Sequence, residues 1–401
     1  MKILQINSVC GIRSTGRICT DIADILMENG AECRIGYGRN AVPERYCRLA
    51  VPIGERKDLL IHGVGSRLLD NSGFYSKAAT RKFLMWVDEY RPDLIHLHNI
   101  HGYYLNVELL FDYLKEKNLP VVWTLHDCWA FTGHCSHFSA IGCEKWKEGC
   151  CGCPLRGEYP RSVWRDNSGG NYRRKKELFC GVKQLQIVTP SDWLSGCAEQ
   201  SFLGNYPIKT IQNGVDLSVF HPVKSDFLES YHLQGKKIVL GVASAWTKHK
   251  GLALFYRLAQ LLDNSYQVVL VGLSAQQIKK LPQNILGIAR TNCVQELVQI
   301  YSAAYVHVSM SREETMGLTL IEANACGTPV IVFNSTALPE IVTPETGMVL
   351  QECTPEAVAR ALQNNDFSRE RFMSSCVTHA RQFEKTKMYS KYLELYRSMI
   401  L

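Results

Sequence analysis

The chain has 401 residues, of which 46% are hydrophobic and 21% charged, and its net charge is +7. This length exceeds one compact core and suits two domains, while the composition excludes a disordered protein. No run approaches the roughly 20 apolar residues that cross a bilayer, and the first residues lack the anatomy of a signal peptide. We therefore expect a cytoplasmic protein, at most peripheral at the inner face of the cell membrane.

Short apolar runs alternate with helical patterns through the first half of the chain, a rhythm typical of a parallel sheet covered on both faces. The pattern predicts strands at residues 2–6, 33–37, 94–98, 121–125 and 186–189. It also predicts a loop at 11–16, a helix from there to residue 27, and helices at 81–90 and 107–117. Ligands of such sheets bind beyond the carboxyl ends of the strands, so the loops after the strands hold the candidate site residues.

Small or polar residues follow three of these strands, at Gly16 and Arg17, at His98 and Asn99, and at His126 and Asp127. The first loop is not a G-x-G-x-x-G fingerprint and is a weak signal by itself. A lone histidine is usually a satisfied core or surface group. His126, however, ends a strand and is followed by an aspartate, so we select it and keep the other five as weaker candidates.

Six of the 16 cysteines fall between residues 128 and 153, in what we interpret as an insertion near 128–176. Cys135, Cys143, Cys150 and Cys153 are separated by seven, six and two residues. Four thiolates in a short polar loop would suit structural zinc in tetrahedral geometry. Only the last pair has the C-x2-C spacing of zinc knuckles, so structural zinc and unliganded thiols both remain open. Catalytic zinc is disfavoured, because no histidine ligands of an open site are apparent.

The positive charge is concentrated in the same insertion. Residues 134–176 contain nine Lys or Arg against four Asp or Glu, a local excess of +5, and residues 173–176 read Arg-Arg-Lys-Lys. Such a run is usually a solvated helix face. It could also attract anionic lipid headgroups or a pyrophosphate-linked acceptor. No recognised nucleic-acid-binding motif accompanies the charge, so no nucleic-acid partner is expected.

A turn-rich joint at residues 213–222 separates the first half from a second series of strands, predicted at 237–242, 267–271, 286–289, 306–309 and 329–333. We place the domain boundary near Phe220, and predict a last helix at 386–400. Lys248 and Lys250 follow the first strand of this series. Fixed cations at such a position stabilise the charge that develops on a departing diphosphate.

The stretch 311–330, SREETMGLTLIEANACGTPV, is the most informative part of the chain. Glu314 and Glu322 bracket seven residues, and a helix beginning at Gly317 would be closed by Gly327 and Pro329. The free N–H groups at its start are a seat for phosphate. Glu322 lies a little over one turn into this helix and could accept hydrogen bonds from two hydroxyls. Glu314 lies on the loop before the helix and could reach a sugar beyond the phosphates. The alternative is two glutamates that serve only the helix dipole and the solvent.

With its sequel, this stretch resembles the E-x7-E signature of the retaining GT-B glycosyltransferases of glycosyltransferase family 4. The N-G-V-D-x3-F-x-P joint at 213–222 and the Lys250-Gly251 pair are similar to segments of the same family. Residues 124–135, TLHDCWAFTGHC, resemble a subgroup of bacterial exopolysaccharide and capsule enzymes. The resemblance implies α/β architecture with two Rossmann-like, doubly wound parallel-sheet domains that face a central cleft. Residues 1–220 would bind the acceptor, residues 221–385 would bind the nucleotide sugar, and the helix at 386–401 would cross back to the first domain.

The resemblance also implies roles for the candidate residues. His126, Glu314 and Lys250 would be catalytic, and no metal or cofactor would be required. Arg17, His98, Asn99 and Asp127 would lie on the acceptor side. The donor would be bound by Gly16, Lys248, Lys250, Arg290, Glu314, Met316, Gly317, Leu318, Thr319 and Glu322. The arginine usual in the family just after the strand at 237–242 is absent, since the chain reads Gly-Val-Ala-Ser at 241–244.

The expected activity is transfer of a sugar, with retention, from a nucleotide-diphosphate donor to a growing glycan in surface polysaccharide biosynthesis. A UDP-sugar is the expected donor and a polyprenyl-diphosphate-linked glycan the expected acceptor, with peripheral contact to an anionic membrane. Two alternatives remain. One is a nucleotide-sugar epimerase or a phosphorylase on the same fold, although nothing suggests the pyridoxal phosphate site that a phosphorylase needs. The other is a non-enzymatic, zinc-containing protein that binds nucleic acid or a partner protein.

Overall fold

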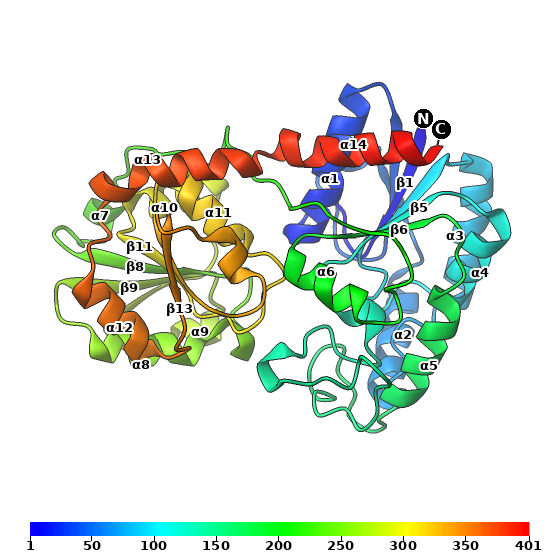
Figure 1. Ribbon diagram of the computed structural model, residues 1–401, viewed down its shortest axis with the longest axis horizontal. Coiled ribbons are helices and arrows are strands. Elements are labelled where there is room, and N and C mark those ends of the chain that lie inside the picture. The colour runs from blue at the N-terminus through cyan, green and yellow to red at the C-terminus, as the bar shows by residue number, and fades with distance from the viewer. Residues whose placement is uncertain (401) are drawn as a thin grey trace. The chain divides into compact units, whose positions relative to one another are not determined.

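The computed structural model describes residues 1–400, which form two compact units (Figure 1). The first unit contains Met1–Gln212 and the residues from Met388 onward, and the second contains Asn213–Lys387. Each unit is a parallel sheet with helices on both faces, so the α/β fold class predicted from the sequence is confirmed. Among residues 1–400, no helix is both long and apolar enough to cross a bilayer.

The first unit is built on seven parallel strands in the order β3-β2-β1-β4-β5-β6-β7. The strands are β1 Lys2–Asn7, β2 Glu32–Tyr37, β3 Ala50–Pro52, β4 Leu94–Leu97, β5 Val121–Thr124, β6 Leu185–Thr189 and β7 Ile208–Thr210. The helices are α1 Arg13–Glu28, α2 Arg56–Leu69, α3 Lys77–Tyr90, α4 Val107–Lys117, α5 Ser168–Phe179, α6 Asp192–Glu199 and α14 Lys385–Ile400. The strand order reverses between β1 and β4, and ligands of such sheets bind beside that point.

Successive side chains of a strand point to opposite faces of the sheet, and both faces here are covered. Ile3 and Leu94 pack in a core with residues of α1 and α14. Leu4 and Ile95 pack in the other core, with residues of α3, α4 and α5. Because each central strand is buried on both sides, it reads as a nearly continuous apolar run, which made these strands recognisable.

Residues between β5 and α5 form the predicted insertion. Apart from two single turns, η2 Trp129–Phe131 and η3 Ser139–Ile141, most of it is irregular. It has its own aromatic core, in which the ring of Trp146 stacks on Phe138 with centroids 4.9 Å apart and lies 5.3 Å from Phe131. The insertion therefore holds its shape by aromatic burial rather than by regular backbone hydrogen bonds.

The second unit is built on six parallel strands in the order β10-β9-β8-β11-β12-β13. They are β8 Lys237–Val242, β9 Tyr266–Val271, β10 Ile285–Ile288, β11 Val306–Ser309, β12 Val330–Phe333 and β13 Gly347–Leu350. The helices are α7 Phe227–Ser230, α8 Leu252–Leu261, α9 Ala275–Ile278, α10 Val294–Ala303, α11 Leu318–Ala325, α12 Pro355–Asn364 and α13 Arg369–Ala380. Here the order reverses between β8 and β11, whose following loops carry Lys250 and Glu314.

Two expected boundaries differ from the structure. The units separate after Gln212 rather than near Phe220, because Val215 and Phe220 are buried in the core of the second unit. The first loop is shorter than predicted, since α1 begins at Arg13, where a positive φ of 57° starts the turn. Gly16 is therefore a buried residue of the first helical turn and not part of the loop.

Candidate active site

In the second unit, the loop that joins β11 to α11 carries the most distinctive motif of the sequence. Gly317 caps α11 in the left-handed region, with φ of 91°. A Cβ atom there would also approach Leu320 and Leu338 to 3.2 Å, so glycine suits the position for two reasons. Gly317, as the N-cap, has no side chain with which to cap the first turn of α11. The N–H groups of Leu318 and Thr319, both partly exposed, are thus suited to an anion.

Glu322 lies in α11 with only 7% of its surface exposed. Its Oε2 accepts a hydrogen bond from the Tyr301 hydroxyl at 3.1 Å, and Tyr301 itself is fully buried on α10. A buried carboxylate is costly unless hydrogen bonds hold it. Tyr301 therefore fixes the orientation of Glu322, which the sequence did not indicate.

Glu314 forms an ion pair with the Nζ of Lys250, and its backbone N–H donates to Thr336 Oγ1 at 2.9 Å. Lys250 ends the turn η4, Lys248–Lys250, and the next residue, Gly251, has φ of +75°. A Cβ atom on Gly251 would lie 2.5 Å from the carbonyl oxygen of Met310. Glycine at position 251 is thus required for the loop after β8 to pack against the end of β11.

A second pair runs beside the first. The Nδ1 of His249 lies 3.0 Å from Glu313 Oε2, and Glu313 is only 3% exposed. The backbone supports the same register, because Arg312 N–H donates to the His249 carbonyl at 3.0 Å. Sequence analysis missed this pair. The only available signal was the pattern Glu-Glu at 313–314 against His-Lys at 249–250, and it does not reveal that the two loops meet.

The remaining donor-side candidates are less closely connected. Met316 is 2% exposed, and its sulfur accepts the Asn213 N–H at 3.0 Å, so its side chain belongs to the core. Lys248 and Arg290 are exposed, and neither takes part in the Lys250–Glu314 ion pair or in the Tyr301–Glu322 hydrogen bond. The structure thus gathers Lys250, Glu314, Gly317 and Glu322 around the start of α11.

In the first unit, buried histidines line the carboxyl ends of β4 and β5. His98 Nδ1 lies 3.0 Å from His126 Nε2, and His98 Nε2 lies 2.9 Å from Gln5 Oε1. Burial, aided by nearby imidazoles, lowers the pKa of His98 well below its usual range. Burial also lowers the pKa of His126 to about 4, against the opposing effect of Asp127. Both rings are therefore neutral at physiological pH.

The hydrogen-bond chain fixes the tautomers of these neutral rings. Gln5 Nε2 donates to the Cys19 carbonyl at 2.9 Å, so Gln5 Oε1 is the acceptor and His98 Nε2 must be the donor. His98 Nδ1 then accepts, and the proton between the rings belongs to His126 Nε2. It follows that in the neutral ring of His126 the proton lies on Nε2 and Nδ1 is unprotonated.

Asp127 is not available in the same way. Its Oδ2 lies 2.8 Å from His101 Nε2, and its Oδ1 accepts the Trp129 N–H at 2.9 Å. Burial raises the pKa of Asp127, but the charge and hydrogen bond of His101 outweigh that effect and hold it at about 2. Asp127 thus anchors the start of the insertion, and His101 is a participant that the sequence did not indicate.

The other first-unit candidates have mixed positions. A Cβ atom on Gly16 would lie 3.1 Å from Val9 and 3.2 Å from Gly11 N, so close packing accounts for this glycine. Asn99 donates its N–H to Asn7 Oδ1 at 3.2 Å, directly beyond β1. Arg17 is exposed on α1. His98, Asn99 and His126 therefore lie together at the ends of β4 and β5.

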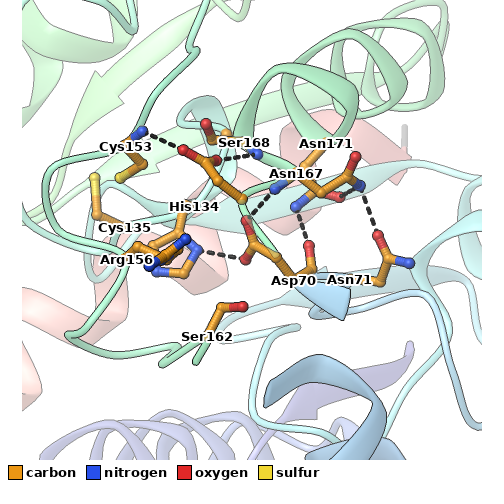
Figure 2. A network of polar contacts seen from close by, with 12 residues as sticks. Asp70, Asn71, His134, Cys135, Cys153, Arg156, Ser162, Asn167, Ser168 and Asn171 are labelled. Atoms are coloured by element: carbon orange, nitrogen blue, oxygen red, sulfur yellow. Dashed lines mark hydrogen bonds and ion pairs between the residues drawn. The ribbon is translucent and has the colours of Figure 1, made fainter. Parts of the chain in front are cut away.

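The four spaced cysteines gather in the insertion but do not form a metal site there. Cys135 and Cys153 lie side by side (Figure 2), and the hydrogen bond from Cys135 lowers the pKa of Cys153 to about 7. Cys150 accepts the Gly133 N–H at 3.2 Å. Within residues 1–400, no three His, Cys, Asp or Glu side chains are placed to hold a metal ion. The residues as placed do not fit zinc, so no step of the mechanism involves it.

The basic run on α5 differs from both sequence-based expectations. Lys175 is 1% exposed, and its Nζ donates to the carbonyls of Trp129 at 2.7 Å and Thr132 at 3.0 Å. Burial lowers its pKa to about 7. Arg174 pairs with Glu108 at 3.0 Å. Lys175 therefore takes no part in a solvated or lipid-binding face, whereas Arg173 and Lys176 are exposed.

Two parallel-sheet α/β units, of seven and six strands, define the GT-B class of glycosyltransferase folds. Sucrose-phosphate synthase of Thermosynechococcus elongatus has this fold, with a TM-score of 0.72, 18% identity and 99% of this chain and 98% of that one covered. Anabaena HepE in complex with UDP has the same fold, with a TM-score of 0.67 and 15% identity. The match covers 99% of this chain and 100% of HepE.

Family models identify the chain more narrowly. Residues 16–219 match the model described as Glycosyltransferase Family 4, and residues 236–364 match Glycosyl transferases group 1. The chain belongs to glycosyltransferase family 4. It is 28% identical over 269 residues to the putative colanic acid biosynthesis glycosyl transferase WcaC of Escherichia coli, covering 65% of this chain and 64% of WcaC. It is 32% identical over 212 residues to the lipopolysaccharide core biosynthesis mannosyltransferase LpcC of Rhizobium leguminosarum, covering 47% of this chain and 60% of LpcC. Each match spans less than two thirds of the relative.

Proposed function

We propose that this protein is a retaining glycosyltransferase that moves a sugar from a nucleotide-diphosphate donor to a growing surface glycan. The observation that carries this proposal is the Lys250–Glu314 ion pair beside the start of α11, where the N-cap is a glycine, with Glu322 buried one turn further on. The ammonium group and the N–H groups match a diphosphate, the carboxylate of Glu322 matches a ribose, and that of Glu314 matches a sugar.

Each residue has a distinct task in this proposal. Glu322, oriented by Tyr301, accepts hydrogen bonds from both ribose hydroxyls. The N–H groups of Gly317–Thr319 hold the diphosphate. Lys250 exchanges its contact with Glu314 for the diphosphate as negative charge grows there, which leaves Glu314 to accept bonds from hydroxyls of the transferred sugar.

The chemical step requires no group beyond the two substrates and this chain. The acceptor oxygen bonds to the anomeric carbon on the face from which the diphosphate departs, as the bond between that carbon and the diphosphate oxygen breaks. The acceptor's hydroxyl proton passes to the departing diphosphate. His126, whose ring is neutral and held by its contact with His98, is the first-unit residue that we propose to contact the transferred sugar.

A UDP-sugar is the proposed donor, and a polyprenyl-diphosphate-linked glycan the proposed acceptor. The donor proposal is supported by the fold's likeness to HepE, which has been solved with UDP and with UDP-glucose. A GDP-mannose-dependent mannosyltransferase of Mycobacterium tuberculosis is 30% identical over 221 residues, so GDP-sugars are the natural comparison. The acceptor proposal is supported by relatives named for colanic acid and lipopolysaccharide core synthesis.

Titration with UDP and GDP, followed by transfer assays, tests the donor site. Glu322→Ala should weaken nucleotide binding roughly 10–100-fold, the equivalent of one or two charge-assisted hydrogen bonds. Glu314→Ala should mainly slow transfer. Glu356→Ala, which removes a surface pair with Arg257, is the matched control and should change neither. Unchanged binding and transfer in both active-site variants would contradict the assignment.

An epimerase on the same fold is the rival that the same preparation tests. Donor incubated without any acceptor should remain unchanged if the protein is a transferase. Accumulation of an isomerised nucleotide sugar in that incubation would favour the epimerase.

A further inference from the structure

Helix α2 of the first unit is amphipathic in the reverse of the usual sense. Leu60 and Ile61 are 67% and 65% exposed, and Val64 and Leu68, which follow on the same face, are exposed as well. The opposite face buries His62, Gly63 and Ser66. A helix on a globular protein normally directs its apolar stripe to the core, so an exposed stripe calls for a partner.

The segment 162–165 extends this apolar face. Val163 N–H donates to the Arg67 carbonyl at 2.8 Å, and Arg165 N–H donates to the Leu68 carbonyl at 3.2 Å. The backbone on both sides of Trp164 is thus fixed to the end of α2. Trp164 is nevertheless 79% exposed, the largest value among the exposed large hydrophobic residues. A tryptophan held outward by its own backbone is not a fraying loop residue.

Hydrogen bonds around Asp70 hold this surface in place (Figure 2). Asp70 follows α2 directly, and its carboxylate lies 2.5 Å from His134 Nδ1 and accepts the Asn167 N–H at 2.8 Å. Its backbone carbonyl accepts the amide of Asn171. Because Asp70 is 1% exposed, this network joins the helix to the insertion from inside and fixes the apolar face on the outside.

The face is hollowed between its two parts. Gly65, Leu68, Leu69 and Trp164 line an apolar cavity of about 530 Å³, with Arg165 and Asp166 also in its wall. Asp166 is occupied, since its carboxylate accepts the N–H groups of Cys153 at 2.6 Å and Ser168 at 2.9 Å. The cavity is therefore open to apolar groups rather than to an ion.

The border of the face is positive. Arg67, Arg161 and Arg165 are all exposed beside it. The nearby acids are engaged: Asp166 as described above, and Glu55 with Lys57 at 3.1 Å. An apolar stripe with a tryptophan and an arginine border is complementary to a bilayer interface with anionic headgroups. A second copy would bring the same arginines against one another, which disfavours self-association.

We propose that this face, Leu60, Ile61, Val64, Leu68 and Trp164 with its arginine border, is the surface by which the protein rests on an anionic membrane. The apolar side chains enter the boundary between headgroups and acyl chains, and each arginine near the headgroups adds electrostatic attraction to the anionic lipids. Membrane binding by this face would bring the protein to a lipid-linked acceptor, and only this role of the face rests on the proposed function.

Vesicle flotation tests the proposal with the whole chain. Wild-type protein should float with vesicles of phosphatidylglycerol and phosphatidylcholine at low and physiological salt, and much less with phosphatidylcholine alone. The triple variant Ile61→Ser, Val64→Ser, Trp164→Ser should bind the anionic vesicles at least about tenfold more weakly, because three exposed apolar groups no longer leave water. Met85→Ser is the matched control, since Met85 is also 67% exposed but lies on α3, and it should bind as wild type does.

Brominated lipid acyl chains should quench Trp164 fluorescence, measured as the difference between wild type and Trp164→Phe. Absence of vesicle binding in the wild type would overturn the proposal, as would equal binding by the triple variant. A wild-type dimer in sedimentation that Trp164→Ser dissociates would overturn it in favour of a second copy. UDP titration of the wild type and of each variant separates the two proposals. A wild type that does not bind UDP would contradict the proposed donor site, but it would not affect the proposal of membrane binding, which vesicle flotation tests.

Discussion

Two regions of the molecule use polar residues in opposite ways. One comprises the loops around Lys250 and Glu314 in the second unit, and the other comprises α2 and the insertion in the first unit. In the second unit, charges sit at a sheet edge where partly exposed groups can exchange partners. In the first unit, Lys175, Asp70 and His96 are buried in networks, whereas leucine, isoleucine and tryptophan face outward. A charged residue in the sequence is thus no guide to surface charge, because a buried network can hold it inside.

The largest effect is expected from a substitution that disrupts the packing of the polar loops in the second unit. Gly251→Ala should lower the free energy of unfolding by about 2–4 kcal/mol and abolish transfer. The added Cβ meets the Met310 carbonyl at 2.5 Å in a left-handed conformation, and Lys250 moves with it. Gly235→Ala is the matched control. Gly235 has nearly the same φ, +76°, and nothing within 4 Å, so only about 1 kcal/mol should be lost in urea unfolding.

The next test compares neighbouring lysines of α5. Lys175→Ala should cost about 3 kcal/mol, because two buried carbonyls lose their donor and the Trp129 ring loses the ammonium that lies 3.4 Å from its centroid. Lys176→Ala, one residue on and exposed, should change stability by less than about 0.5 kcal/mol. Equal effects in urea unfolding would contradict the burial of Lys175.

Acidification should weaken the histidine cluster of the first unit. The pKa values of His96, His98 and His126 are lowered by burial, so between about pH 6.5 and 4 the unfolded chain binds protons that the folded chain does not. The unfolding free energy should fall by roughly 1.4 kcal/mol per pH unit for each such histidine. Thermal unfolding between pH 7 and 5 measures this slope. His98→Gln should flatten it, whereas His221→Gln, in an exposed position, should not.

The smallest effect concerns metal. We expect EDTA to leave UDP binding and transfer unchanged, because the proposed step uses Lys250 and backbone N–H groups where other enzymes use a metal. Zinc analysis of protein purified without a histidine tag addresses the cysteines separately. If zinc is bound, its removal should increase proteolysis within residues 135–153 and nowhere else. Loss of transfer on chelation would contradict the proposed chemistry.

The regular elements were largely predictable from the sequence. The helix at 107–117 and the strands at 237–242 and 306–309 have the predicted bounds, because buried central strands and amphipathic helices leave clear patterns. The strands β3, β7 and β13 were not predicted, because they lie at sheet edges and none of their residues is fully buried, so they lack the signal of a central strand. Helix α2 has an apolar stripe, but a stripe does not reveal whether it faces the core or the solvent.

The candidate site was predictable where its residues are contiguous. Glu314, Gly317 and Glu322 fall within nine residues, so their spacing together with the family resemblance predicted that they lie around the start of one helix. The Glu313–His249 pair, the Tyr301 hydroxyl behind Glu322 and the Gln5–His98 contact join residues far apart in the chain. Such pairings depend on which loops meet, and one sequence contains no signal for that.

The last helix of the chain has a consequence for synthesis on the ribosome. Tyr392 bonds to Thr124 at 3.0 Å, and Tyr396 bonds to His96, from positions 268 and 300 residues further along the chain. One face of the first sheet therefore lacks part of its cover until the whole second unit has been made. The contiguous second unit can complete its own core earlier. Domains usually finish in the order of translation, but here the unit that begins first is completed last.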